Sequence, residues 1–236
     1  SHEFLSLEKA AEHIQIEANE LKHVAQRGEI DATVRSGEWY FDHAALDEWA
    51  QRNLLTANAK RIAARNRAFA EKRRRERKEA LSIRDIFRAD AIDLSMKAKA
   101  KAGIIRDMTD LADRTGLVYD PSALFRELVA REEVASTAVG ADAAFLHPRY
   151  HDPYFFEESF IAYARSERPV FFGAPDGAPT RHFFLICSTD HDQHLHILAR
   201  LAVLAHGTNL VERLEEAAEP GDVIKILGEC EAEYLK

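Results

Sequence analysis

The sequence predicts an α/β domain over residues 81–236, preceded by a small module of helices and a hairpin and by a connecting helix. Three observations lead to this prediction. From Leu81 onward, helical stretches alternate with short apolar strands, the pattern of α/β domains. Residues 1–52 combine short amphipathic helices with one hairpin, and residues 53–80 contain neither glycine nor proline. We therefore expect three parts: 1–52, 53–80 and 81–236.

The first module shows helical periodicity interrupted by turn signals. Apolar residues recur at helical spacing, Ser6 suits the N-cap of the first helix, and Gly28 suits the end of the second. A Ser-Gly pair between two β-prone runs indicates a hairpin. The expected elements are helices at 7–14, 18–27 and 43–49 and two strands within 33–41.

Residues 53–80 are rich in Ala, Arg, Lys and Glu, which favours one continuous helix. Leu55, Ile62 and Phe69 are spaced by heptads, so a weak apolar stripe could pair with a second copy and form a homodimer. Residues 60–78 carry ten basic and two acidic side chains in a chain whose net charge is −8. The predicted linker helix is therefore a cationic segment between two acidic parts.

The last part alternates helical and strand-like segments over a length typical of one domain. Turn signals such as the Pro-Asp-Gly within residues 174–179 separate them. The expected helices are 97–114, 121–133, 193–206, 209–216 and 222–227, and the expected strands are 143–146, 160–163 and 183–187.

Composition argues against several classes of protein. No apolar run approaches the roughly 20 residues that cross a bilayer, and no signal peptide opens the chain. Cys187 and Cys230 lie far apart without metal-site spacing, which favours a reducing compartment. We expect a cytoplasmic protein that inserts into no membrane and needs no cofactor.

Histidines, arginines and hydroxyls recur at the edges of apolar elements in the last part of the chain. His147 follows the apolar run 143–146 and precedes Pro148, which places it at a strand end. A histidine that holds a phosphoryl group must present one ring nitrogen while its other nitrogen is fixed, and cationic groups must offset the negative charge. The constellation that suits this chemistry comprises Arg131, Ser136, Thr137, His147, Arg149 and His194.

This ordered set resembles the fructose/mannitol/nitrogen-regulatory type of enzyme IIA domain of the bacterial phosphotransferase system. The matching stretches are Arg131-Glu132, Ser136-Thr137 with Gly140, His147 with Arg149, and later His194-Leu195. The resemblance implies a mixed sheet flanked by helices, with His147 as phosphoacceptor and His194 as the second site histidine. It also implies that Arg131 and Arg149 supply positive charge, and that Ser136 and Thr137 bond the acceptor ring or the phosphoryl oxygens.

The chain departs from the family pattern beside the acceptor. Ala141-Asp142 follows Gly140 where the family has Asn-Gly, and Pro148 replaces a glycine. We expect a carboxylate near the site, which would disfavour a phosphohistidine. The alternative is therefore a degenerate, non-phosphorylated enzyme IIA-like domain that serves as a sensor or dimerisation domain. A transport component that passes phosphate to a permease is a third option.

The first module resembles the excisionase-type (MerR-like) winged helix-turn-helix, on core matches that include Ala10, Ala11, Gly37, Trp39 and Trp49. In such a module the second helix enters the major groove and the hairpin touches the DNA backbone. The acidic charge of the module argues against tight binding alone, and the basic linker could compensate. The expected DNA-binding residues are Asn19, Lys22, His23, Arg27 and Arg35.

A dense run of His and Asp side chains at 190–196 raises the possibility of a metal site. His194 and His196 are two residues apart and point to different sides of a helix, so we expect no metal. The sequence thus predicts a regulatory protein of the phosphotransferase system. A histidine-phosphorylated carrier protein would phosphorylate His147, and this state would tune the binding of DNA or of a partner protein.

Overall fold

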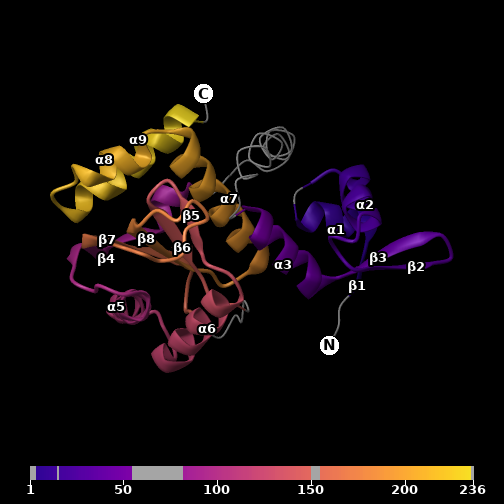
Figure 1. The fold of residues 1–236 in the computed structure, drawn as a ribbon, viewed down its shortest axis with the longest axis horizontal. Coiled ribbons are helices and arrows are strands. Elements are labelled where there is room, and N and C mark those ends of the chain that lie inside the picture. Colours follow the sequence, from indigo (N-terminus) through magenta and orange to yellow (C-terminus); the bar gives the residue numbers. More distant parts are fainter. Residues whose placement is uncertain (1–3, 15, 55–81, 150–154, 235–236) are drawn as a thin grey trace. The chain divides into compact units, whose positions relative to one another are not determined.

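A computed structural model describes residues 4–14, 16–54, 82–149 and 155–234. The chain separates into two compact units, Ser1–Ala80 and Leu81–Lys236, which are described one at a time. Most of the predicted linker helix, with its proposed dimerisation stripe, lies outside the described residues. Figure 1 shows the ribbon and the element labels used below.

The N-terminal unit packs three helices on a small antiparallel sheet. Its elements are β1 (Phe4–Ser6), α1 (Leu7–His13), α2 (Ala18–Gln26), β2 (Ala32–Arg35), β3 (Glu38–Asp42) and α3 (His43–Leu54), with strand order β1-β3-β2. The apolar periodicity is confirmed for most of the inward residues, which are buried, while Leu7 and Ala25 are partly exposed. The core consists of Ala10, Ala11, Ile14, Ile16, Leu21, Val24, Ile30, Phe41, Leu46, Trp49 and Ala50.

The ends of the helices in this unit differ in detail from the prediction. Ser6 occupies the N-cap of α1, but its side chain forms no capping hydrogen bond because it already ends strand β1. Asp42 caps α3 through Oδ1, which accepts hydrogen bonds from the amides of Ala44 and Ala45. The predicted Ser-Gly turn is confirmed, with positive φ at Ser36 and Gly37 between β2 and β3.

The C-terminal unit is built on a five-stranded mixed sheet with strand order β4-β7-β8-β6-β5. The strands are β4 (Phe87–Met96), β5 (Ala138–Gly140), β6 (Ala143–Leu146), β7 (Phe160–Val170) and β8 (Thr180–Cys187). β4 is parallel to β7 and β6 is parallel to β8, whereas β7–β8 and β5–β6 are antiparallel. The predicted mixed sheet is therefore confirmed.

Helices cover both faces of this sheet, as Figure 1 shows. They are α5 (Lys101–Asp113) and α6 (Pro121–Val134) on one face and α7 (His191–Gly207), α8 (Leu210–Glu215) and α9 (Pro220–Tyr234) on the other, with a short 3₁₀ turn, Ile83–Ile86, before β4. Successive side chains along β6 and β8 point to opposite faces. Leu146 packs into the core with α5 and α6, so Phe145 and the next residue in phase, His147, face the α7 side.

Sequence patterns located the central strands but missed the edge strands. β4 and β5 were not expected, since both are edge strands whose ladders are irregular and whose alternation is broken. The helix expected from residue 97 begins at Lys101, after an extended N-cap at Ala100. The last helix runs from Pro220 to Tyr234 and is longer than the predicted segment, 222–227.

No helix among the described residues is both long enough and apolar enough to cross a membrane. Cys187 and Cys230 are both buried and both carry free thiols, and burial raises the pKa of Cys187 well above its usual value. These two thiols are therefore packing groups of the C-terminal core.

Candidate functional site

His147 lies immediately after strand β6, at the end where β6 and β8 both finish. Its side chain is fully buried on the α7 side of the sheet. Pro148 follows it, is also buried, and ends the strand because it lacks a backbone N–H. The prediction that His147 stands at a strand end is confirmed.

Two hydrogen bonds define the tautomer of His147. Its Nδ1 lies 2.9 Å from the carbonyl oxygen of Phe145, which can only accept, so Nδ1 carries the proton. Its Nε2 lies 3.0 Å from Nε of Arg131, which can only donate. The ring is therefore neutral, with the Nε2 lone pair directed toward a guanidinium group.

Arg131 is held in place from its own helix. It sits in the last turn of α6, is only 3% exposed, and donates through Nη1 to the carbonyl of Ala135 at 2.9 Å. This bond orients the guanidinium group so that its Nε–H points at Nε2 of His147. The arrangement brings a permanent positive charge next to Nε2 of His147.

His194 approaches His147 from the first turn of α7. The two ring centroids are 4.9 Å apart with an interplanar angle of 55°, and His194 is fully buried. Asp190 caps the helix by accepting from the amide of Gln193 at 2.8 Å. Because the N-terminus of a 17-residue helix carries partial positive charge, this region suits a negatively charged group close to His147.

The hydroxyl groups of Ser136 and Thr137 do not bind His147. Thr137 donates its hydroxyl proton to Oε2 of Glu132 at 2.7 Å, and Ser136 donates to the carbonyl of Phe172 at 3.0 Å. The expected bond from these hydroxyls to the acceptor ring is therefore not formed, and their role toward phosphoryl oxygens stays a prediction. Both hydroxyls instead hold the loop between α6 and β5.

Glu132 and Lys101 were not predicted as part of this arrangement. Glu132 accepts from Lys101 Nζ at 3.0 Å and also from the amide of Thr137 at 3.0 Å, and its side chain is 5% exposed. The buried carboxylate thus links the start of α5 to the loop before β5. The sequence could have indicated Glu132, because it directly follows Arg131 in the Arg-Glu pair of the motif.

Arg149 lies two residues after His147 and is exposed, at the border of the described segment. The structure brings the buried side chains of His147, His194 and Arg131 together, whereas Arg149, the remaining charged residue of the predicted site, is exposed. Its cationic side chain remains a predicted contributor to charge compensation.

Asp142 is not near His147, which corrects the expectation of a destabilising carboxylate. It lies before β6, whereas His147 lies after it, so roughly 13 Å of extended strand separates the two positions. Oδ1 of Asp142 accepts from the backbone amide of Arg181 at 2.7 Å, and burial raises the pKa of this carboxyl group. The carboxylate therefore belongs to the opposite end of the sheet.

A further buried histidine, His182, occupies that opposite end. Tyr163 Oη lies 2.8 Å from His182 Nδ1, and Glu215 Oε1 lies 3.0 Å from Nε2. Burial lowers the pKa of His182 to about 4, although Glu215 acts in the opposite direction. The neutral ring therefore donates through Nε2 to Glu215 and accepts from Tyr163, whose pKa is raised by burial. Sequence reasoning did not identify this group.

The predicted DNA-binding residues lie on one helix and one strand of the N-terminal unit. Asn19, Lys22 and His23 are on α2, and Arg27 is its C-cap residue. Arg27 donates to Glu29 at 2.6 Å. Arg35, at the end of β2, stacks over the rings of two aromatic neighbours, Phe4 at 5.5 Å and Tyr40 at 6.0 Å. Both arginines are exposed, but both already have partners.

The His and Asp run at 190–196 does not converge on one point. Among the described residues, two groups place three metal-ligand atoms close together, and neither contains a residue of this run. The first group is His13, His43 and Asp47, and the second is Asp142, His182 and Glu215.

The C-terminal unit is similar to proteins of a known family. Residues 85–230 match the family model described as phosphoenolpyruvate-dependent sugar phosphotransferase system, EIIA 2. The nitrogen regulatory protein of Bradyrhizobium diazoefficiens is 27% identical over 150 residues, which cover 62% of this chain and 95% of that protein. The fructose-specific EIIABC component of Bacillus subtilis is 26% identical over 151 residues, but the match spans 63% of this chain and only 23% of that protein.

A solved structure supports the same assignment. The crystal structure of nitrogen regulatory protein IIA-Ntr from Neisseria meningitidis aligns with a TM-score of 0.56 and 27% identity, covering 61% of this chain and 98% of that one. The matched family model covers more than half of the chain and includes every residue of the arrangement around His147. The chain therefore belongs to the EIIA type 2 family of the phosphoenolpyruvate-dependent sugar phosphotransferase system.

Proposed function

We propose that His147 accepts a phosphoryl group at Nε2 from a histidine-phosphorylated carrier protein of the phosphotransferase system, and that the chain is a regulator. The observation that carries this proposal is the pair of hydrogen bonds that fixes His147 as the Nδ1–H tautomer with Nε2 facing Arg131. Nitrogen regulatory proteins among the relatives support a regulatory function related to this system.

The transfer exchanges one phosphorus–nitrogen bond for another. The bond to the donor histidine breaks and the Nε2 lone pair of His147 forms the new bond. The proton stays on Nδ1, which continues to donate a hydrogen bond to the carbonyl oxygen of Phe145. Arg131 must first release Nε2, since its Nε–H occupies the lone pair. The same N–H then bonds a phosphoryl oxygen, and His194 and the start of α7 offer further positive potential.

Full burial of His147 sets a condition on this mechanism. A carrier protein can reach Nε2 only after the guanidinium group of Arg131 has turned aside. The alternative, a degenerate domain that is never phosphorylated, loses one of its supports because Asp142 lies at the other end of β6. It retains the other support, the proline at position 148 in place of the family's glycine.

Phosphorylation of the full chain with phosphoenolpyruvate, enzyme I and the carrier protein decides between these two functions. We expect acid-labile label on the wild-type protein and none on His147→Gln. His206→Gln is the matched control, since His206 is a half-buried histidine of the same unit on α7 and should label normally. Absence of label on the wild type, or equal label on His147→Gln, contradicts the proposal.

We also propose that the N-terminal unit is a winged helix-turn-helix that binds DNA, with α2 in the major groove and the β2–β3 hairpin as the wing. Its order of elements supports this proposal, as do the exposed Asn19, His23, Arg27 and Arg35. The basic residues 60–78 supply the charge that the unit lacks. In this proposal phosphorylation of His147 tunes DNA or partner binding.

A binding assay on random and genomic DNA fragments at low salt tests the second proposal. Arg35→Glu should weaken binding by roughly tenfold or more, because it replaces a phosphate contact with a repulsion. Arg114→Glu, a charge reversal at the C-cap of α5 in the other unit, should have little effect. No affinity for any DNA at low salt would contradict the proposal that the N-terminal unit binds DNA.

A further inference from the structure

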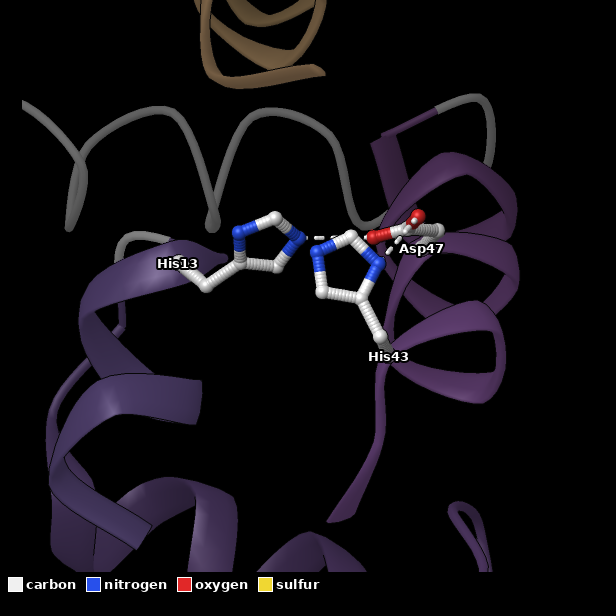
Figure 2. Close-up of side chains that lie close together, drawn as sticks. All are labelled: His13, His43 and Asp47. Atoms are coloured by element: carbon white, nitrogen blue, oxygen red, sulfur yellow. Dashed lines mark hydrogen bonds and ion pairs between the residues drawn. The ribbon is translucent and has the colours of Figure 1, made fainter. Parts of the chain in front are cut away.

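The N-terminal unit brings together two histidines and one aspartate that the phosphoryl-transfer function does not use. His13 is the last residue of α1, His43 is the first residue of α3, and Asp47 follows one turn later on the same helix. Figure 2 shows both imidazole rings directed toward the carboxylate of Asp47. The three side chains come from two helices that are separated by α2 and the hairpin.

The ligand atoms already have nearly the spacing that a metal ion requires. Nε2 of His13 lies 2.8 Å from Oδ1 of Asp47, and Nδ1 of His43 lies 3.3 Å from Oδ2. The two ring centroids are 4.3 Å apart, and one ligand atom from each residue lies within 4.8 Å of the others. Tetrahedral zinc, with bonds of 2.0–2.1 Å, holds its ligand atoms roughly 3.3 Å apart. Shifts of about 1 Å or less would therefore close a site.

The surrounding structure holds the three side chains in position. Asp42 caps α3 directly before His43, so the N-terminal end of the helix, which carries His43 and then Asp47, is fixed. Both helices pack on the buried core of the unit. The side chains of His13, His43 and Asp47 are 10%, 34% and 19% exposed, which leaves an entry path while most of the surrounding water is excluded.

The donor set indicates the class of metal. Two imidazole nitrogens and one carboxylate suit zinc and the neighbouring transition metals, whereas calcium and magnesium prefer oxygen ligands only. Three protein ligands leave one position of a tetrahedral ion for water or another donor. The ion would replace the ring protons that now point at the carboxylate of Asp47.

The other convergent group is less suited to a metal. In the group of Asp142, His182 and Glu215 there is only one imidazole, and its Nε2 is 4.0 Å from Asp142. Arg181 already compensates both carboxylates, through its backbone amide on Asp142 and its guanidinium group 2.9 Å from Glu215. A divalent cation would have to compete with that fixed positive charge.

We propose that His13, His43 and Asp47 form a binding site for a divalent transition metal ion of the zinc class, and that the bound ion joins the end of α1 to the start of α3. This site goes beyond the proposed phosphoryl-transfer function and lies in the other unit. The metal stabilises the N-terminal unit because it binds the folded arrangement and not the unfolded chain.

Calorimetric titration of the chelator-treated full chain with Zn²⁺ tests this site, with Co²⁺ absorption as a second readout of tetrahedral geometry. We expect the wild type to bind one equivalent of Zn²⁺ at this site. Asp47→Asn should lose that equivalent or bind it at least roughly 100-fold more weakly, a larger loss than the removal of an outer-shell partner causes. An amide in place of Asp47 still accepts a hydrogen bond, so the fold survives. Asp31→Asn, an exposed aspartate of the same unit, should bind like the wild type.

Asp47→His separates metal binding from a purely structural hydrogen-bonded group. A third imidazole keeps three metal ligands but cannot accept two ring N–H bonds, so Zn²⁺ should still bind and raise the unfolding midpoint. Equal stoichiometry and affinities within about threefold for the wild type and Asp47→Asn would overturn the site. Phosphorylation of His147 in the same variants should be unchanged, which keeps this outcome separate from the proposed function.

Discussion

Two buried histidines on the same face of one sheet differ in what faces their Nε2 atoms. His147 follows β6 and His182 lies near the start of β8, and because these strands are parallel the two residues occupy opposite ends of the sheet. Both side chains are fully buried. Nε2 of His147 lies 3.0 Å from a guanidinium nitrogen, whereas Nε2 of His182 lies 3.0 Å from a carboxylate oxygen.

The difference shows how a neighbouring charge selects the chemistry of a buried imidazole. A donor such as Arg131 keeps Nε2 unprotonated, with its lone pair accepting a hydrogen bond, while a carboxylate such as Glu215 requires a proton on Nε2. The unprotonated Nε2 of His147 therefore suits the nucleophile that we propose, whereas Nε2 of His182 carries a proton that it donates to Glu215 on α8. Burial alone does not distinguish them.

The largest expected effect comes from reversing the charge of Arg131, the partner of His147 Nε2. Arg131→Glu should put a carboxylate opposite Nε2 of His147, force a proton onto that atom, and lower the rate of phosphorylation by roughly 10²–10³-fold or more. Arg131→Lys should retain part of the rate, since it keeps the charge. The measurement is the initial rate of labelling by the phosphorylated carrier protein.

Arg126→Glu is the control for this charge reversal, because Arg126 lies on the same helix and is exposed. Its labelling rate should stay close to that of the wild type. A normal rate in Arg131→Glu would show that the partner of Nε2 does not control the reactivity of His147.

The next effect is a dependence of stability on pH that originates at His182. Its pKa falls from 6.5 to about 4 on folding because of burial, so the unfolded state binds more protons between these values. The contribution of His182 to the free energy of unfolding should be fully present above pH 6.5. It should be lost as the pH falls toward 4, by at most about 3 kcal/mol. Urea unfolding followed by circular dichroism at several pH values measures this.

His182→Phe should flatten that dependence over the same window, because no group at this position is left to protonate. The difference between the two pH profiles isolates His182 from the carboxylates that titrate nearby. Parallel profiles would mean that His182 is not the origin of the acid sensitivity.

Removal of the hydroxyl of Tyr163 should produce a smaller loss. Tyr163→Phe leaves Nδ1 of His182 without its donor in a buried site, which should lower the free energy of unfolding by about 1–3 kcal/mol. Tyr119→Phe, at a side chain that is 61% exposed, should change stability by much less. Neither variant should alter phosphorylation of His147. A slower rate of phosphorylation in Tyr163→Phe would show that the two ends of the sheet are coupled.

The smallest effect concerns the turn between β5 and β6, which contains Asp142. Ala141 and Asp142 have φ values of 49° and 60°, in the left-handed region that costs a residue with a Cβ atom about 1–2 kcal/mol. Ala141→Gly should therefore raise the free energy of unfolding by about 0.5–1 kcal/mol. Ala102→Gly, at an exposed position in α5, should lower it by a similar amount, and a decrease in both variants would contradict the explanation.

Much of the C-terminal fold could be predicted, because local patterns encode it. The apolar runs of β6, β7 and β8 and the periodic face of α7 follow from side-chain alternation and helical spacing. The edge strands β4 and β5 escaped prediction, since a strand with only one neighbour carries a weak pattern and here an irregular ladder. The position of His147 after β6 followed from the apolar run and Pro148.

The sequence by itself determined the order of the motif residues and the strand end that carries His147. Only the tertiary structure decided which group faces each ring nitrogen, that the hydroxyls of Ser136 and Thr137 donate elsewhere, and that Asp142 lies at the far end of β6. The physical reason is that hydrogen bonds and charges act over a few ångströms in space. His182 and Glu215 are 33 residues apart in the chain yet in contact, whereas an extended strand separates Asp142 from His147.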